Sequence, residues 1–89
     1  MEEIKKAASK EMSRMNEIMK LTKVISNEKN AKHFFEFSQN YYKDGIHFFN
    51  EKKFIESFEA FIISWAYIDI GLKLKFFSVP KEQEKYFTA

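Results

Sequence analysis

The 89-residue chain contains no cysteine, one proline and two glycines. The lack of cysteine excludes a disulfide framework and catalysis by a thiolate. The scarcity of glycine and proline favours long helices over hairpins and sheets. Because Gly45 and Gly71 are the only glycines, the sequence has no glycine-rich loop for binding phosphate, which excludes P-loop and Rossmann nucleotide sites.

The sequence also lacks a strong excess of charge and a long hydrophobic run. Its 15 basic and 13 acidic residues give a net charge of +2, and they alternate along the chain as they do on a solvated surface. The charged residues 1–6 lack the apolar core of a signal peptide. The longest apolar run, which ends at Leu72, is interrupted by Ser64 and Asp69 and is shorter than the ~20 residues of a membrane span. We therefore expect a cytoplasmic protein without membrane contact.

Aromatic side chains are abundant, with 11 Phe, 4 Tyr and 1 Trp. A domain of this length buries only about 60% of the surface that its unfolded chain exposes, so it depends on large apolar side chains or on an oligomer. Full burial of one phenylalanine stabilises the fold by roughly 1.5–3 kcal/mol. The aromatic residues can therefore supply the core of one small domain over residues 1–89.

Apolar residues recur with the 3.6-residue period of amphipathic helices in three segments. We predict a single helical domain with helices over about residues 2–25, 31–50 and 54–77 and a short C-terminal tail over residues 78–89. Neither glycine nor proline stands between the first two helices, so the pattern leaves open whether they are continuous. Pro80 cannot continue the third helix, and the polar residues 50–53 suit the turn of an antiparallel hairpin.

The predicted hairpin has the residue spacing of a tetratricopeptide helix pair. Small residues at Gly45, Ser57 and Ser64 allow its two helices to approach closely, while aromatic side chains fill the space between them. Because the sequence contains only one such unit, a solenoid of repeats is excluded. The predicted fold is all-α, an antiparallel three-helix bundle in which the first helix packs across a tetratricopeptide-like hairpin.

The third predicted helix is apolar nearly all round. One strong stripe includes Phe61 and Ile68, and a second apolar set lies roughly opposite. A helix of this kind is either central or has a partner on its second face. We predict that the second face is a protein-interaction or self-association surface, unless the C-terminal tail covers it, and that it binds another protein or forms a homo-oligomer. The residues of this predicted surface are Ile63, Ala66, Tyr67, Ile70 and Leu74.

A sequence motif spans the predicted hairpin. Two adjacent aromatic residues are followed, after one position, by an aspartate, a small residue and a further aromatic. A Ser-Phe pair comes after the predicted turn, and an aspartate and a glycine stand near the end of the last helix. The motif residues are Tyr41, Tyr42, Asp44, Gly45, Phe48, Phe58, Asp69 and Gly71.

This motif, over about residues 34–77, resembles the signature of a family of small, mainly archaeal, all-helical proteins known only as a domain of unknown function. The chain has Ser57 where the family has an alanine before its phenylalanine, and Trp65 and Ile70 also depart from the usual small or polar residues. The resemblance implies an all-helical fold and no particular activity. We expect the motif residues to have structural roles.

Asp44 and Asp69 are the residues that a catalytic function would use, because both stand beside apolar stripes. In the predicted hairpin the positions of the two aspartates along the helix axes differ by roughly ten residues, or ~15 Å. Paired carboxylates that hydrolyse glycosides stand about 5–9.5 Å apart. We therefore predict no catalytic residues. The alternative is a small enzyme or ligand-binding protein that uses both aspartates, His33 and neighbouring tyrosines around a polar pocket. His33 and Asp69 could meet there, because they lie at similar positions along the axis of the predicted hairpin.

We predict neither a metal site nor a cofactor. His33 and His47 stand 14 residues apart on one predicted helix, which is ~21 Å at the helical rise, so they cannot share an ion. A pair such as His47 and Glu51 supplies only two ligands, whereas metal sites in helical bundles need several converging pairs. A third hypothesis is weak nucleic-acid binding through the lysine-rich residues 20–32. This stretch contains Glu28 and no stacking aromatic residue among its lysines, which favours a solvated face.

Overall fold

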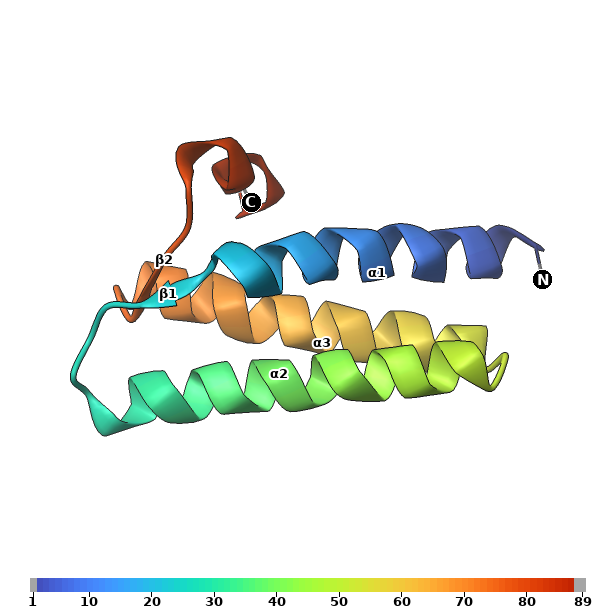
Figure 1. The fold of residues 1–89 in the computed structure, drawn as a ribbon, viewed down its shortest axis with the longest axis horizontal. Coiled ribbons are helices and arrows are strands. Elements are labelled where there is room, and N and C mark those ends of the chain that lie inside the picture. Colours follow the sequence, from blue (N-terminus) through green and yellow to red (C-terminus); the bar gives the residue numbers. More distant parts are fainter. Residues whose placement is uncertain (1, 88–89) are drawn as a thin grey trace.

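The computed structural model describes residues 2–87, so Met1 and the last two residues of the predicted tail, Thr88 and Ala89, lie outside the described residues. Its three long helices are α1 (Glu2–Leu21), α2 (Lys29–Asn50) and α3 (Phe54–Lys73). Consecutive helices run in opposite directions, and α3 lies between α1 and α2 (Figure 1). α1 and α2 contact each other less than each of them contacts α3. The predicted all-α fold class is confirmed.

α1 and α2 are separate helices. α1 ends at Leu21 rather than near Ile25, where the apolar pattern predicted its end. The carbonyl of Ile18 accepts both the N–H of Thr22 at 2.9 Å and its buried hydroxyl at 2.7 Å, at the end of the helix. The following residues include the β-branched Val24 and Ile25, which favour extended backbone.

The extended segments after α1 and α3 pair with each other. β1 (Lys23–Val24) and β2 (Phe77–Ser78) form a two-stranded antiparallel sheet. The N–H of Ile25 adds a hydrogen bond to the carbonyl of Phe76 at 2.8 Å. This pairing joins parts of the chain that are far apart in sequence, and helical periodicity contains no information about it.

Two residues after the end of α2 and of α3 stands a lysine in the left-handed region of backbone space, since Lys52 and Lys75 each have a φ of 63°. After α3, the N–H of Phe76 donates to the carbonyl of Gly71 at 2.8 Å and the N–H of Lys75 donates to that of Leu72 at 3.1 Å. This pair of bonds is a Schellman motif, which usually has glycine at the left-handed position. The motif ends α3 at Lys73, four residues before the predicted end.

A row of small residues brings α2 and α3 close together. On each helix the row advances in steps of seven residues, and all its members are buried. They are Ala31, Ser38 and Gly45 on α2 and Ser57, Ser64 and Gly71 on α3. The Ser57 hydroxyl donates to the carbonyl of Gly45 at 2.7 Å. The Ser38 and Ser64 hydroxyls donate to each other's backbone carbonyls at 2.9 and 2.7 Å, so every hydroxyl in the row has a partner.

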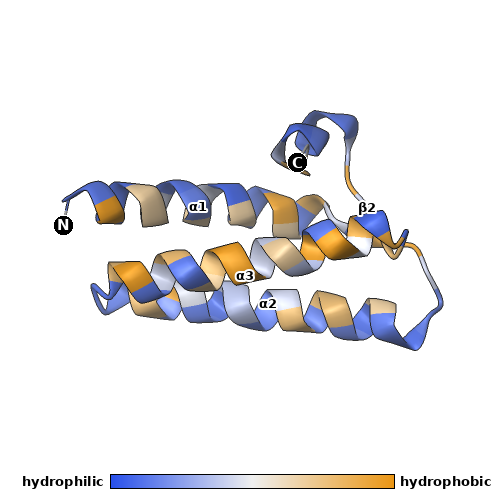
Figure 2. Cartoon of the chain, turned by 180° about the vertical axis from the view of Figure 1, so that it is seen from behind, coloured by the Kyte–Doolittle hydropathy of each residue, from blue (hydrophilic) through white to orange (hydrophobic). Residues whose placement is uncertain are grey.

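The hydrophobic core lies around α3, the most hydrophobic of the three helices (Figure 2). Met15 and Ile18 of α1 are fully buried against it, as are Phe61 and Ile68 of α3 itself. Phe77 of β2 closes one end of this cluster. Within residues 2–87, no helix has the length and hydrophobicity that crossing a membrane requires.

Candidate functional site

The two aspartates considered for catalysis do not share a site. The Asp44 side chain is exposed on α2 and makes no hydrogen bond or ion pair with any residue between 2 and 87. It lines a hollow of about 210 Å³ together with residues that include Tyr41 and Glu59, but not Asp69. The Asp69 carboxylate instead binds the Lys73 ammonium one turn further along α3, at 2.6 Å.

The two histidines are also apart. The ring of His33 lies beside that of Phe37, with 6.4 Å between centroids, and no hydrogen bond or ion pair joins it to Asp69 within residues 2–87. His47 lies near Glu51 at 3.4 Å on the exposed end of α2. In this same part of the chain no three histidine or acidic side chains come close enough to hold a metal ion.

Several motif residues lie where helices meet. The ring of Tyr41 stacks on that of Tyr67 of α3, with 6.0 Å between centroids and an interplanar angle of 18°. The Tyr42 hydroxyl accepts a hydrogen bond from the side-chain amide of Asn16 of α1 at 2.8 Å. A Cβ atom built on Gly71 would overlap the ring of Phe77.

A group of large exposed apolar side chains lies on α3, on the side that faces neither α1 nor α2. Figure 2, which views the chain from behind, shows α3 in front of α2 on this side. The large exposed side chains of α3 and of its C-cap residue, Leu74, are Ile55, Ile62, Ile63, Ile70 and Leu74, which are 58%, 39%, 40%, 46% and 53% exposed. These five residues and Ala66, which lies among them on the helical wheel, are called the outer face of α3. A hollow of about 350 Å³ is lined by Ile62, Ile63, Ala66, Tyr67 and Ile70.

The outer face differs in part from the surface predicted from the sequence. Tyr67 is half-buried, because its ring packs edge-on against Phe34 of α2, with 5.6 Å between centroids, as well as on Tyr41. Ile55 and Ile62 were not predicted, although a projection of α3 at 100° per residue places both beside Ala66.

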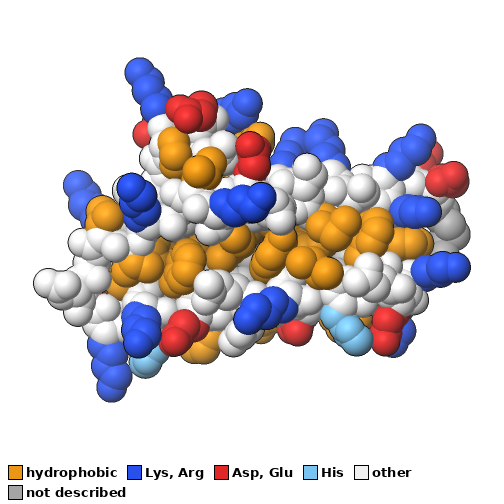
Figure 3. Space-filling model, viewed as in Figure 1, with side chains coloured by type: hydrophobic (Ala, Val, Ile, Leu, Met, Phe, Trp, Pro, Cys, Tyr) orange, Lys and Arg blue, Asp and Glu red, His pale blue; other side chains and the backbone are white. Residues whose placement is uncertain are grey.

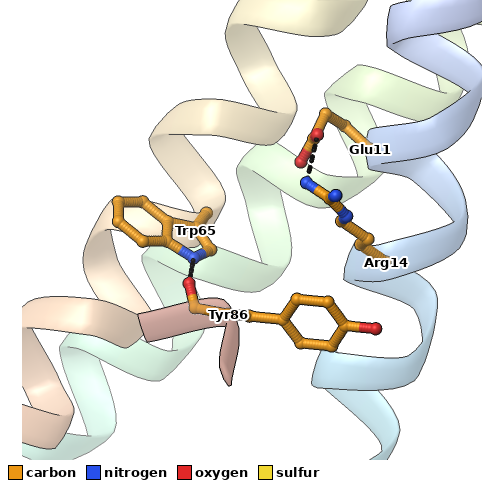
Figure 4. A network of polar contacts seen from close by, with 4 residues as sticks. All are labelled: Glu11, Arg14, Trp65 and Tyr86. Carbon is orange, nitrogen blue, oxygen red and sulfur yellow. Dashed lines mark hydrogen bonds and ion pairs between the residues drawn. The ribbon is translucent and has the colours of Figure 1, made fainter. Parts of the chain in front are cut away.

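The C-terminal tail does not cover the outer face. It forms the short 3-10 helix η1 (Lys81–Phe87). The Trp65 indole N–H donates to the carbonyl of Tyr86 at 2.9 Å, and its ring stacks on that of Phe87 with 5.7 Å between centroids. Arg14 of α1, held by Glu11 at 2.9 Å, lies over the Tyr86 ring (Figure 4). The tail therefore binds α3 on the side of α1.

A second band of hydrophobic side chains runs along the molecule between α1 and α2 (Figure 3). Apolar residues of these two helices, among them Met12, Met19 and Ile46, are half-buried and pack against the core. The hydrogen bond from Asn16 to Tyr42 connects α1 and α2 directly. The side chains named here are half-buried, although the band is open to solvent in Figure 3, whereas the large side chains of the outer face are 39–58% exposed.

The sequence over residues 1–77 matches the model of the family described as "Protein of unknown function (DUF357)". The chain belongs to this family. The match confirms the family resemblance of the motif and extends it to the whole of α1, beyond residues 34–77. No curated protein matches this DUF357 chain.

The fold of this DUF357 chain is similar to the crystal structure of protein AF1782 from Archaeoglobus fulgidus, which is described under the same family. The TM-score is 0.76 at 22% sequence identity, over 89% of this chain and 96% of that chain. The similarity shows the fold alone.

Proposed function

We propose that this protein is a non-enzymatic protein-interaction module and that the outer face of α3 is its binding surface. The observation that carries the proposal is the concentration of exposed apolar side chains on this helix. Of the nine large hydrophobic residues exposed within residues 2–87, four belong to α3 and a fifth, Leu74, directly follows its last residue. Scattered apolar residues are normal on a protein surface, but a contiguous exposed patch is typical of an interaction site.

The chemistry of the surface favours recognition by burial of apolar area. The five residues that line the hollow on the outer face are Ile62, Ile63, Ala66, Tyr67 and Ile70, of which only Tyr67 has a polar side-chain atom. Binding sites for small substrates combine an apolar lining with several converging polar groups. The enzyme alternative has less support, because Asp44 and Asp69 line no common hollow and Asp69 is bound to Lys73. A cytoplasmic location and the absence of a nucleic-acid partner remain predictions from the sequence.

Replacement of an outer-face isoleucine by glutamate tests the proposal. Ile63→Glu and Ile70→Glu each place a charge where a partner would exclude water, so we expect association to weaken at least tenfold. Helix content measured by circular dichroism should stay unchanged, because both side chains are exposed.

Ile25→Glu is the matched control, since Ile25 is also exposed but follows β1, outside the outer face. Self-association is measured by light scattering over a range of concentrations, and association with other proteins by quantitative co-precipitation from a cell extract. If Ile63→Glu and Ile70→Glu associate as strongly as Ile25→Glu in both assays, the outer face is not a binding surface.

A further inference from the structure

Three residues define the midline of the outer face. Glu59, Ala66 and Lys73 follow one another at steps of seven residues along α3. Seven residues are close to two helical turns, so these side chains lie almost in line along the helix. An acid therefore stands on one side of the central residues Ile62 to Ile70, a base stands on the other, and the small side chain of Ala66 lies midway.

From this arrangement we infer that the outer face binds a second copy of the chain, with the two α3 helices antiparallel and crossing at Ala66. The inference rests on the proposed function and names the partner. In a two-fold contact centred on Ala66, Glu59 lies opposite the partner's Lys73, and Lys73 lies opposite the partner's Glu59. In the same register Ile62 lies opposite the partner's Ile70.

The charges select the antiparallel arrangement. In a parallel pair, Glu59 would face the partner's Glu59 and Lys73 would face the partner's Lys73, so two repulsive contacts would replace two attractive ones. The Glu59 side chain makes no hydrogen bond or ion pair within residues 2–87. The Lys73 ammonium binds Asp69 at 2.6 Å, but this side chain is 56% exposed. With three N–H donors, the ammonium can bind a second carboxylate.

The size of the surface suits a weak dimer. The 20 residues of α3 rise over ~30 Å, and the small side chain of Ala66 at the crossing allows the helix axes to approach to about 8–10 Å. A single helix pair buries less area than the roughly 800 Å² per partner of a standard stable interface. We therefore expect a dimer that forms at micromolar or higher concentration.

Single-cysteine variants test the register, because the chain contains no cysteine of its own. In Ala66→Cys the two thiols meet at the crossing, where axes about 8–10 Å apart place the Cα atoms close enough for a disulfide. Ile62→Cys alone should not cross-link, because the partner's Ile62 lies eight residues away along the helix, or ~12 Å. A mixture of the Ile62→Cys and Ile70→Cys chains should form the mixed disulfide. Ser9→Cys, on the exposed surface of α1, reports random collisions.

Charge reversal tests the proposed ion pairs. Glu59→Lys and Lys73→Glu should each weaken the dimer about tenfold, because two attractive contacts become repulsive. The double variant Glu59→Lys/Lys73→Glu should restore it, and so should a mixture of the two single variants. Glu3→Lys, a reversal on the exposed surface of α1, should leave the dimer unchanged. Dissociation constants are measured by sedimentation at low and high salt, and circular dichroism checks that every variant is folded.

The inference is supported if Ala66→Cys cross-links faster than Ser9→Cys and the double charge reversal restores the dimer. A chain that stays monomeric at all concentrations up to about 1 mM overturns it, since the dissociation constants of specific protein pairs lie well below this concentration. Cross-linking of Ile62→Cys to itself, as in a parallel pair, also overturns it.

If the chain stays monomeric while Ile70→Glu abolishes binding to a different protein, the dimer is wrong and the proposed interaction function stands. If Ile70→Glu affects no association at all, both are wrong.

Discussion

Gly45→Ala tests whether the first glycine of the motif is a packing requirement. Gly45 lies in the row of small residues between α2 and α3, and its carbonyl accepts the hydrogen bond of the Ser57 hydroxyl. A Cβ atom built on Gly45 would overlap the ring of Phe61, at 2.6 Å from Cδ1 and 2.8 Å from Cζ. Phe61 is fully buried, so the ring cannot move away without displacing its neighbours.

Two opposing effects determine the size of the change. Alanine in a helix interior is more favourable than glycine by roughly 0.5–1 kcal/mol. Overpacking of a filled core costs typically 1–3 kcal/mol. Because the overlap is with a fully buried ring, which also lies 6.0 Å from the ring of Tyr42, we expect the overpacking to exceed the helical gain. The predicted net loss of stability is about 1–2 kcal/mol, and each kcal/mol corresponds to about 4–8 °C in melting temperature for a domain of this size.

Urea unfolding followed by circular dichroism measures the loss of stability, and Phe61→Leu supplies the control. Leucine is smaller than phenylalanine and leaves room for the added methyl group, so Gly45→Ala should cost less in the Phe61→Leu background than in the original chain. A double-mutant cycle gives this coupling directly. If Gly45→Ala is neutral or stabilising in the original chain, or costs the same in both backgrounds, the ring of Phe61 is not what requires glycine at this position.

Two further predictions concern the end of α3 and the tail. Lys75→Gly should stabilise the protein by about 0.5–1 kcal/mol in urea unfolding, because glycine adopts the left-handed conformation of this residue without steric cost. An unchanged or lower stability would show that Lys75 makes compensating contacts. Phe87→Ala should release the tail from Trp65 and shift the tryptophan emission to longer wavelength while helix content stays the same. Trp65 is the only tryptophan, so unchanged emission would mean that the stacking does not shield it from water.

The sequence was sufficient to predict the number and order of the long helices. Amphipathic periodicity placed them over about residues 2–25, 31–50 and 54–77, and the described helices are Glu2–Leu21, Lys29–Asn50 and Phe54–Lys73. The largest errors, of four residues each, lie at the two ends that lead into β1 and β2. Those ends depend on a pairing between distant segments and on a left-handed lysine, neither of which changes the apolar period.

The candidate surface was predicted less completely. Ile63, Ala66, Ile70 and Leu74 lie on the outer face as the second apolar stripe indicated, but Tyr67 turns toward the aromatic residues of α2. Ile55 and Ile62 were missed, although the helical period of α3 places both beside Ala66. The pairing of His33 with Asp69 fails because Asp69 binds Lys73 on its own helix.

The sequence by itself determined that the protein is all-α, that residues 50–53 turn one helix back on another, and that small residues stand where those helices meet. These features are local, because periodicity, turn residues and side-chain size act within a few residues of one another. Only the tertiary structure decided that α3 lies between α1 and α2, that the tail packs on Trp65, and that Glu59, Ala66 and Lys73 lie on an uncovered face. Burial is a property of a side chain and its neighbours together, so the free face of α3 follows from how the helices pack.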